Sequence, residues 1–333
     1  RLQPLFEAYN PFAARAVRRA LKEFRPDVVH VSMFLWQLSP AILPQLFAVP
    51  AVYHVMTYKP VCPLGTKTLP DGRPCGVAPG RVCLTGGCLT GPSWLARSVQ
   101  QALWRRWRGA FDRIVPVSES VAARLREGGF AVDRPIVPGV ASRPPRPPLS
   151  GPPTVAFAGR LAREKGAEVL LRALPAVIAR VPDARLIVAG DGPESRPLRR
   201  LAADLGIEDR TCFLGHVGSE RLDAALAPAW VQAVPSLWDE PFGLVVPEAM
   251  MRGTAVVASD AGGLAESVVH GETGILVRGG DPDALAGALA RILSSRETAE
   301  TMGAAGRHRA LRDFRESVFV EAFLQIYREL LAA

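Results

Sequence analysis

Hydrophobic and polar positions alternate along the first part of the chain with two different periods. Between Asn10 and Phe24, apolar residues recur three or four positions apart, as on one face of a helix. Short apolar runs at 28–31 and 50–55 suit buried strands, and a helix-like stretch at 38–47 lies between them. A strand, a helix and a second strand in this order predict a parallel sheet with right-handed crossovers.

The second part of the chain repeats this alternation more regularly. Six apolar runs are predicted as strands separated by helices, at 154–158, 184–189, 211–214, 230–234, 255–258 and 273–277. The proline-rich segment 138–153 can form neither a helix nor a central strand. We therefore predict an α/β protein with one domain at 1–138, a semi-rigid linker at 139–153, a second domain at 154–314 and a C-terminal helix at 315–333.

Length and composition agree with this division. The 333 residues suit two domains of about 150 residues each, and 48% hydrophobic with 22% charged residues is typical of globular proteins. No apolar run approaches the roughly 20 residues that cross a bilayer, and we recognise no signal peptide. We expect a cytoplasmic protein that could rest on the inner face of a membrane. Because the sequence opens at Arg1 within a predicted helix, we also expect residues to be missing upstream.

The net charge of +8 comes from arginine rather than lysine. The arginines are scattered and form no basic helix with interleaved aromatic residues, so we predict no nucleic-acid partner. A compositional bias explains the charge, and attraction to anionic lipid or to an anionic donor is the alternative. Trp94, Trp104 and Trp107 lie among arginines in a predicted helix, where they could pack inside or form a membrane-facing surface.

The segment 239–250 carries the strongest chemical signal. Glu240 precedes a predicted helix, and Glu248 lies in its first turns eight positions later. Between them, three backbone amides would point out of the helix N-terminus, where anions bind: those of Phe242, Gly243 and Leu244. The segment thus offers hydroxyl acceptors at both ends and phosphate donors in the middle, as a sugar nucleotide requires. An amphipathic helix with two solvated acids is the other interpretation.

Further candidates follow the predicted strands of the second domain. Gly159 would let the backbone approach a ligand, and Arg160 and Lys165 could neutralise phosphate. The next two strands are followed by Gly190 with Gly192, and by His216 with Val217. Carboxyl ends of parallel strands meet at one edge of a sheet, where ligands bind. The alternative interpretation is a surface ion pair and ordinary tight turns.

Two features of the first domain have several explanations. Four cysteines occur in the loop 61–91: Cys62, Cys75, Cys83 and Cys88. They could hold a structural zinc, form two disulfides, or remain free thiols, although their spacings lack the usual two-residue zinc knuckle. His30 and His54 lie near strand ends, where they could be site residues or hydrogen-bonded structural residues.

The segment 239–250 resembles the E-x7-E signature of glycosyltransferase family 4, retaining enzymes of the GT-B fold, and the resemblance covers about residues 20–330. Residues 159–166 resemble the G-R-L-x-x-x-K-G motif of the family, and 190–193 resemble its G-x-G-P turn. Residues 58–63 resemble the end of a His-Asp-Tyr…Cys-Pro segment found in a branch with a cysteine-bearing loop. This chain has Met56 and Thr57 in place of the histidine and the aspartate.

This resemblance implies two Rossmann-like domains that face a cleft, with the N-terminal one incomplete at its start and the last helix crossing back to it. Arg160 and Lys165 would neutralise the diphosphate, Glu240 would contact sugar hydroxyls, and His54 is a further catalytic candidate. The implied donor-binding residues are Gly159, Gly190, Gly192, His216, Val217, Phe242, Gly243, Leu244 and Glu248, the last of them on the ribose.

The resemblance also implies the reaction. A sugar would move, with retention and without a metal cofactor, from a nucleoside-diphosphate sugar to a hydroxyl of a glycan, lipid-linked or small-molecule acceptor. Such a transferase would serve cell-envelope or polysaccharide biosynthesis. The departure at Met56 and Thr57 favours an alternative, a nucleotide-sugar-binding protein or inactive remnant that no longer catalyses. A sugar-nucleotide epimerase on the same fold is a third hypothesis.

Overall fold

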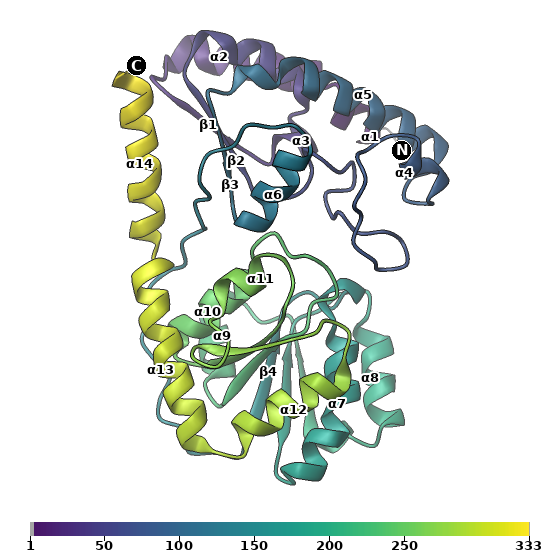
Figure 1. The fold of residues 1–333 in the computed structure, drawn as a ribbon, viewed down its shortest axis with the longest axis vertical. Helices are drawn as coiled ribbons and strands as arrows, with labels where there is room; N and C mark the ends of the chain where they lie inside the picture. Colours follow the sequence, from purple (N-terminus) through teal and green to yellow (C-terminus); the bar gives the residue numbers. More distant parts are fainter. Residues whose placement is uncertain (1–2, 333) are drawn as a thin grey trace. The chain divides into compact units, whose positions relative to one another are not determined.

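The computed structural model describes residues 3–332 and divides the chain into two compact units. Unit 1 contains the chain up to Val137 and again from Phe319 onward, whereas unit 2 runs from Pro138 to Val318. Figure 1 labels the helices and strands of both units. Each unit is a parallel sheet covered by helices, which is the Rossmann-like arrangement predicted from the alternating pattern.

Unit 1 is built on a parallel sheet in the order β1-β2-β3, with β1 at Val29–Ser32, β2 at Ala51–Val55 and β3 at Arg113–Pro116. Its other elements are α1 (Gln3–Ala8), α2 (Pro11–Phe24), α3 (Phe34–Gln37), η1 (Pro40–Ala48), α4 (Val82–Thr85), α5 (Gly91–Trp107), η2 (Arg108–Ala110) and α6 (Glu119–Glu127). One face of the sheet carries an aromatic core in which Tyr53 packs against Phe34, Trp104 and Phe111.

The last helix, α14 (Glu316–Ala332), covers the opposite face of this sheet. Phe323 and Ile326 of α14 are buried against Val52 of β2 and Val115 of β3. Most of α14 therefore belongs to unit 1, although the chain has passed through the whole of unit 2 before reaching it.

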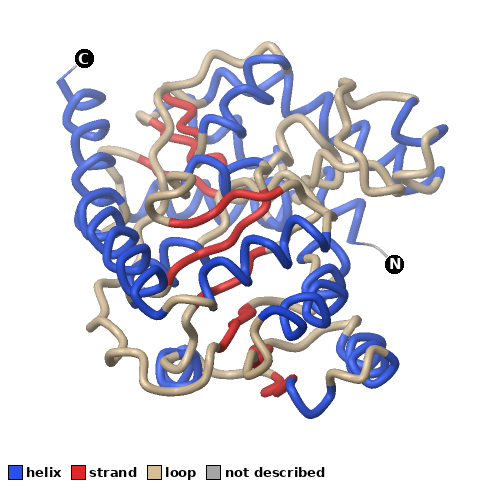
Figure 2. The backbone as a smooth tube through the Cα atoms, turned by 60° about the horizontal axis from the view of Figure 1, so that its bottom comes forward, coloured by secondary structure: helices blue, strands red, loops and turns tan. Residues whose placement is uncertain are grey.

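Unit 2 contains a six-stranded parallel sheet in the order β6-β5-β4-β7-β8-β9. The strands are β4 (Thr154–Ala158), β5 (Arg185–Ala189), β6 (Thr211–Gly215), β7 (Val231–Val234), β8 (Ala255–Ser259) and β9 (Gly274–Val277). The helices are η3 (Arg163–Lys165), α7 (Ala167–Arg180), α8 (Ser195–Asp204), η4 (Glu208–Arg210), α9 (Ser219–Leu226), α10 (Val245–Arg252), α11 (Gly262–Ser267), α12 (Pro282–Leu293) and α13 (Arg296–Asp313). Figure 2 shows helices on both sides of these strands.

The strand order reverses between β4 and β7, because β4 is followed in the chain by β5 on one side and paired with β7 on the other. In sheets of this kind ligands bind beyond the carboxyl ends of the strands at the reversal point. The main core lies behind this edge, where Leu170 and Leu174 of α7 and Leu289 of α12 are fully buried against the sheet.

The proline-rich segment differs from the predicted linker, because it packs along unit 2. The amide of Arg146 donates to the carbonyl of Arg252 at 2.8 Å, and its guanidinium pairs with Glu300 at 3.0 Å. Leu149 is buried in the main core of unit 2. Polyproline geometry leaves backbone groups free, and here Arg252 and Glu300 bond to them.

Two further local differences have clear causes. The predicted helix at 38–47 is the 3₁₀ helix η1, because Pro44 inside it has no amide proton for a regular helical bond. The short helices α3, α4 and α9 were not predicted, whereas α1 lies where a helix was expected at the start of the sequence. Within residues 3–332, no helix combines the length and the apolar composition needed to cross a membrane.

Candidate functional site

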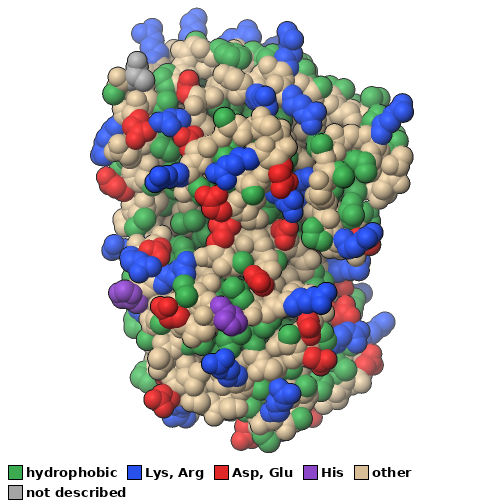
Figure 3. All heavy atoms as spheres, viewed as in Figure 1, with side chains coloured by type: hydrophobic (Ala, Val, Ile, Leu, Met, Phe, Trp, Pro, Cys, Tyr) green, Lys and Arg blue, Asp and Glu red, His purple; other side chains and the backbone are tan. Residues whose placement is uncertain are grey.

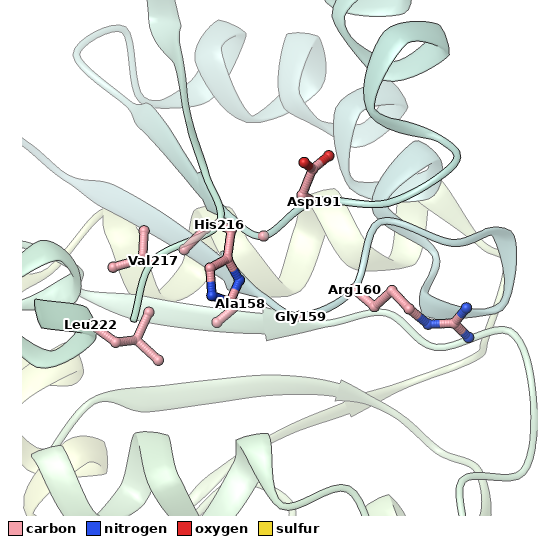
Figure 4. A pocket seen from close by; sticks show the side chains of 9 residues that line it. Ala158, Gly159, Arg160, Asp191, His216, Val217 and Leu222 are labelled. Carbon is pink, nitrogen blue, oxygen red and sulfur yellow. The ribbon is translucent and has the colours of Figure 1, made fainter. Parts of the chain in front are cut away.

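A pocket of about 370 Å³ opens beyond the carboxyl ends of β4, β5 and β6 (Figure 4). Its floor consists of small residues at the ends of β4 and β5, and its wall comes from the turn after β6 and from Leu222 of α9. The lining residues are Ala158, Gly159, Arg160, Ala189, Gly190, Asp191, His216, Val217 and Leu222. Five of them were predicted as site residues from the sequence, and the fold brings those five together.

Two glycines set the depth of this pocket. A Cβ atom on Gly190 would lie 1.8 Å from the carbonyl oxygen of Gly159, and its φ of +149° is strained for any other residue. A Cβ on Gly192 would lie 2.4 Å from the carbonyl oxygen of Leu161. Only glycine at both positions allows the turns after β4 and β5 to pack in direct backbone contact.

The turn at Asp191 is held by its own side chain. The carboxylate accepts a hydrogen bond from the amide of Gly192 at 2.7 Å and another from the hydroxyl of Ser195. The Ser195 and Gly192 hydrogen bonds hold the pKa of this carboxyl below its usual range. Asp191 is therefore committed to shaping the turn.

Lys165 and Glu240 form the charged centre of the candidate site. The Lys165 ammonium lies 2.7 Å from Oε1 of Glu240, and the hydroxyl of Ser236 donates to the same oxygen at 2.6 Å. Glu240 is 5% exposed, so this carboxylate is held by two partners in a nearly dry environment. The sequence predicted Lys165 and Glu240 as site residues, whereas it gave no signal for Ser236.

The N-terminus of α10 adjoins this carboxylate. Gly243 has a φ of +86°, and a Cβ at this position would lie 2.3 Å from the Leu264 side chain and 3.5 Å from Oε2 of Glu240. Among the residues that the structure describes, no internal acceptor is recorded for the amides of Gly243 and Leu244. The helix therefore presents free amides beside the Lys165–Glu240 pair, as predicted for an anion site. Phe242 is buried and supports the turn from below.

The glycine turn at Gly262 and Gly263 holds the backbone of the site and does not offer the Gly263 amide to a ligand. The amide of Gly263, at the start of α11, donates to the carbonyl oxygen of Glu240 at 2.8 Å. A Cβ on Gly262 would lie 2.3 Å from that same carbonyl oxygen. This turn therefore fixes the backbone that carries Glu240.

Glu248 lies on α10 within a partly buried charge network. Burial raises the pKa of its carboxyl, and nearby Arg252 and Arg143 oppose this effect while Asp223 adds to it. Arg252 and Arg143 are both paired with Asp223, at 3.3 and 2.7 Å. Within the described part of the chain, the side-chain carboxylate of Glu248 has no hydrogen-bond or ion-pair partner, although its backbone amide donates to the carbonyl of Leu244. Its carboxylate is thus available to an external donor such as a hydroxyl.

Arg160 is the more exposed of the two predicted cations, because its side chain is 63% exposed against 27% for Lys165, and it pairs with Glu164. Figure 4 shows it reaching away from His216 and Leu222. Its backbone lines the pocket, but its guanidinium would have to turn to reach a ligand there.

His54 lies in the core of unit 1, and we leave it out of the site. It is 2% exposed, its Nε2 atom lies 3.2 Å from the carbonyl oxygen of Ile136, and Phe319 and Phe323 of α14 pack on its ring. Burial lowers its pKa to about 4. His30, also lowered in pKa by burial, bonds to the hydroxyl of Tyr327 at 2.5 Å. Both histidines are explained as structural residues under α14.

The cysteine loop is shaped by hydrogen bonds between its cysteines and Lys67. Sγ of Cys62 accepts a hydrogen bond from the amide of Lys67 at 3.4 Å, and the amide of Cys75 donates to the carbonyl of Lys67 at 2.7 Å. Burial raises the pKa of the Cys88 thiol, and Cys83, Cys75 and Cys62 add to this effect. In the described residues, no three His, Cys, Asp or Glu side chains could together hold a metal ion. The zinc hypothesis stays a prediction.

Comparisons with known proteins match both units. Residues 141–309 match the family "Glycosyl transferases group 1", and residues 3–139 match "Glycosyl transferase 4-like domain". A glycogen synthase of Mycobacterium tuberculosis is 31% identical over 313 residues, which cover 92% of this chain and 69% of that one.

A GDP-mannose-dependent alpha-(1-6)-phosphatidylinositol monomannoside mannosyltransferase of Mycolicibacterium smegmatis is 40% identical over 169 residues, 49% of this chain. That match spans 44% of the relative, so the chain covers less than half of its length.

Solved structures agree on the fold. Sucrose-phosphate synthase from Thermosynechococcus elongatus superimposes with a TM-score of 0.73 and 26% identity over 96% of this chain and 77% of that one. Anabaena HepE in complex with UDP gives a TM-score of 0.72 and 22% identity over 96% and 82% of the two chains. The predicted α/β fold with two Rossmann-like domains is confirmed. The protein is a member of the glycosyl transferases group 1, the glycosyltransferase family 4 of GT-B fold that its motifs resemble.

Proposed function

We propose that this chain binds a nucleoside-diphosphate sugar at the carboxyl edge of the unit 2 sheet and transfers its sugar to an acceptor hydroxyl. The observation that carries the proposal is the Lys165–Glu240 pair beside the free amides of α10. A cation and a helix N-terminus favour a pyrophosphate, and a carboxylate next to them favours sugar hydroxyls.

The nucleoside would occupy the pocket beyond β4, β5 and β6. Its floor of Gly159 and Gly190 is flat because side chains are absent there, and Val217 with Leu222 offer an apolar wall for a base. The unpartnered carboxylate of Glu248 would accept hydrogen bonds from the ribose. HepE, a protein of the same fold, has been solved in complex with UDP and with UDP-glucose. The related mannosyltransferase of Mycolicibacterium smegmatis is GDP-mannose-dependent.

The diphosphate would compete with Glu240 for Lys165. In the structure the Lys165 ammonium is already neutralised by Glu240, at 2.7 Å. Binding of the donor would share this ammonium between Glu240 and a phosphate oxygen, with Arg160 turning in as a second cation. Charge that grows on the leaving diphosphate would thus meet two cations and the end of a helix, which supports transfer without a metal.

Glu240 is better suited to hold the sugar than to attack it. Its Oε1 atom is engaged by Lys165 and Ser236, which lowers the nucleophilicity of the carboxylate and fixes its position. We therefore propose retention through attack of the acceptor on the same face from which the diphosphate leaves. The acceptor is a hydroxyl of a glycan, a lipid or a small molecule.

The test is transfer by purified protein with Glu240→Gln beside it. GDP-mannose and UDP-glucose are first compared as donors by thermal shift, because a bound donor raises the melting temperature. We expect one donor to be consumed, an α-linked product from an α-linked donor, and unchanged turnover in EDTA. Loss of turnover in EDTA would refute the metal-free step, and an inverted product would refute retention.

A second candidate is a nucleotide-sugar-binding protein without transferase activity, favoured by Met56 and Thr57 and by the buried position of His54. It predicts a donor-induced thermal shift with neither transfer nor donor hydrolysis. Restoring histidine and aspartate by Met56→His with Thr57→Asp would then create turnover. If the unaltered chain already turns over donor, this candidate is eliminated.

A further inference from the structure

The three helices α1, α2 and α5 form an unusual outer layer of unit 1. α1 packs on α5, and α2 and α5 both pack on η1. Figure 1 shows α2 and α5 running along the same side of this unit. The amide nitrogen of the Gln100 side chain donates to the carbonyl of Glu7 at 2.5 Å, and Arg97 pairs with Glu7 at 2.8 Å, so α1 is fixed to α5.

Large apolar side chains point outward from this layer instead of inward. Each of six is at least 42% exposed: Leu5 60%, Phe6 42%, Tyr9 52%, Phe12 65%, Leu95 61% and Val99 44%. The rings of Phe6 and Phe12 lie 6.4 Å apart, which joins α1 to the start of α2. Exposed apolar residues that cluster in this way mark interaction surfaces more often than scattered ones do.

The exposed stripe of α5 lies opposite its buried stripe. Leu95, Val99 and Arg106 follow one another at helical spacing on the outer face, whereas Gln100, Gln101 and Trp104 are buried. The outer face of α5 is therefore apolar along most of its length and basic at its end.

The same layer is strongly basic. The three helices carry seven basic residues and two acidic ones, a net charge of +5 within a chain whose total is +8. One of the two acids, Glu7, is buried and paired with Lys59 and Arg97, so it does not offset the surface charge. Figure 3 shows Lys and Arg side chains standing out along this side of unit 1. The exposed basic residues are Arg15, Arg18, Arg19, Lys22, Arg105 and Arg106.

We propose that this layer docks unit 1 on an anionic lipid surface. Aromatic and aliphatic side chains would enter the boundary between headgroups and acyl chains, while the surrounding cations contact anionic headgroups. The combination decides between partners: a protein interface is depleted in charge at its centre, whereas a lipid headgroup layer favours apolar anchors surrounded by arginine and lysine. The proposal does not depend on the transferase reaction.

The structure changes which residues carry this role. Trp104, which the sequence suggested as part of a membrane-facing surface, is instead fully buried in the aromatic core. The Trp94 indole donates to the carbonyl of Gly80. The lipid-facing residues are instead those of α1, the start of α2 and the opposite side of α5.

Sedimentation with vesicles tests the proposal. We expect the chain to pellet with vesicles of phosphatidylcholine mixed with phosphatidylglycerol, and to remain in the supernatant with phosphatidylcholine alone or at high salt. The double variant Phe6→Ser with Phe12→Ser and the double variant Arg15→Glu with Arg19→Glu should each weaken binding at least tenfold. Because all four side chains are exposed, both variants should keep the melting temperature of the unaltered chain.

Matched controls lie elsewhere in the chain. Leu331→Ser removes a 59% exposed leucine from α14, on the other face of the unit 1 sheet, and Arg196→Glu with Arg200→Glu reverses two exposed charges on α8 of unit 2. Both controls should bind vesicles as the unaltered chain does. Equal binding by the Phe6 and Phe12 variant overturns the proposal. A second outcome also overturns the proposal: the unaltered chain binds no vesicles but self-associates, and the Phe6 and Phe12 variant does not self-associate. The layer would then join two copies of the chain.

Discussion

Ser236 offers the sharpest test of the site, because among residues 3–332 its hydroxyl bonds to Glu240 alone. Its hydroxyl is buried, 1% exposed, and lies 2.6 Å from Oε1 of Glu240. A hydrogen bond to a charged group contributes about 1.5–3 kcal/mol, and Lys165 would still restrain the carboxylate after its loss. We therefore expect Ser236→Ala to lower kcat/KM for sugar transfer by about ten- to a hundredfold, since about 1.4 kcal/mol corresponds to a factor of ten.

The assay separates positioning from folding. Because Glu240 would contact the sugar and not the nucleotide, Ser236→Ala should bind the free nucleoside diphosphate as tightly as the unaltered chain. Ser294→Ala is the control, since that hydroxyl donates to the carbonyl of Ala290 at 2.7 Å on α12. Transfer by Ser236→Ala within twofold of the unaltered protein, with an unchanged melting temperature, would refute the assignment of Glu240.

Three further results are expected. Gly190→Ala should lower the unfolding free energy by about 3 kcal/mol or more in urea titrations and should abolish donor binding, because its Cβ would meet the carbonyl of Gly159 at 1.8 Å. Gly218 has open space around it, so Gly218→Ala should change neither the unfolding free energy nor donor binding. Donor affinity, measured by calorimetry, should fall as pH falls through the raised pKa of Glu248, because the protonated carboxyl accepts ribose hydrogen bonds poorly. A donor affinity that does not depend on pH would contradict this role of Glu248, and so would the same pH profile in Glu248→Gln. His54 is neutral in the folded chain down to about pH 4, whereas the unfolded chain binds a proton near 6.5. The unfolding free energy should therefore fall by about 3 kcal/mol as pH falls between these values, and His54→Phe should remove that fall.

The fold could be predicted because its pattern is local. Each strand of unit 2 is a short apolar run between turn residues, and the predicted bounds at 154–158 agree with those of β4. Glu240 and Lys165 could be proposed because both follow strands that a parallel sheet brings to one edge. α9 escaped prediction because it has only eight residues, too few to show a clear helical period.

The remaining errors come from contacts distant in sequence. His54 has the position of a site residue at the end of β2, but the ring is covered by Phe319 and Phe323, more than 260 positions later. The segment 138–153 has the composition of a linker, but Glu300 and Arg252 bind it to unit 2. Ser236 gave no signal because a serine in a loop does not reveal which carboxylate it bonds to.

The return of α14 to unit 1 has a consequence for how the protein is made. A ribosome releases residues 319–332 after the rest of unit 1 and after unit 2, so until then Val52, His54 and Val115 of the unit 1 sheet face water. Unit 2 holds all of its own strands and can close while the chain is still being synthesised. Synthesis that stops before α14 would therefore leave a folded unit 2 joined to a unit 1 whose sheet is exposed on one face. Chaperones would then be needed chiefly by the part translated first.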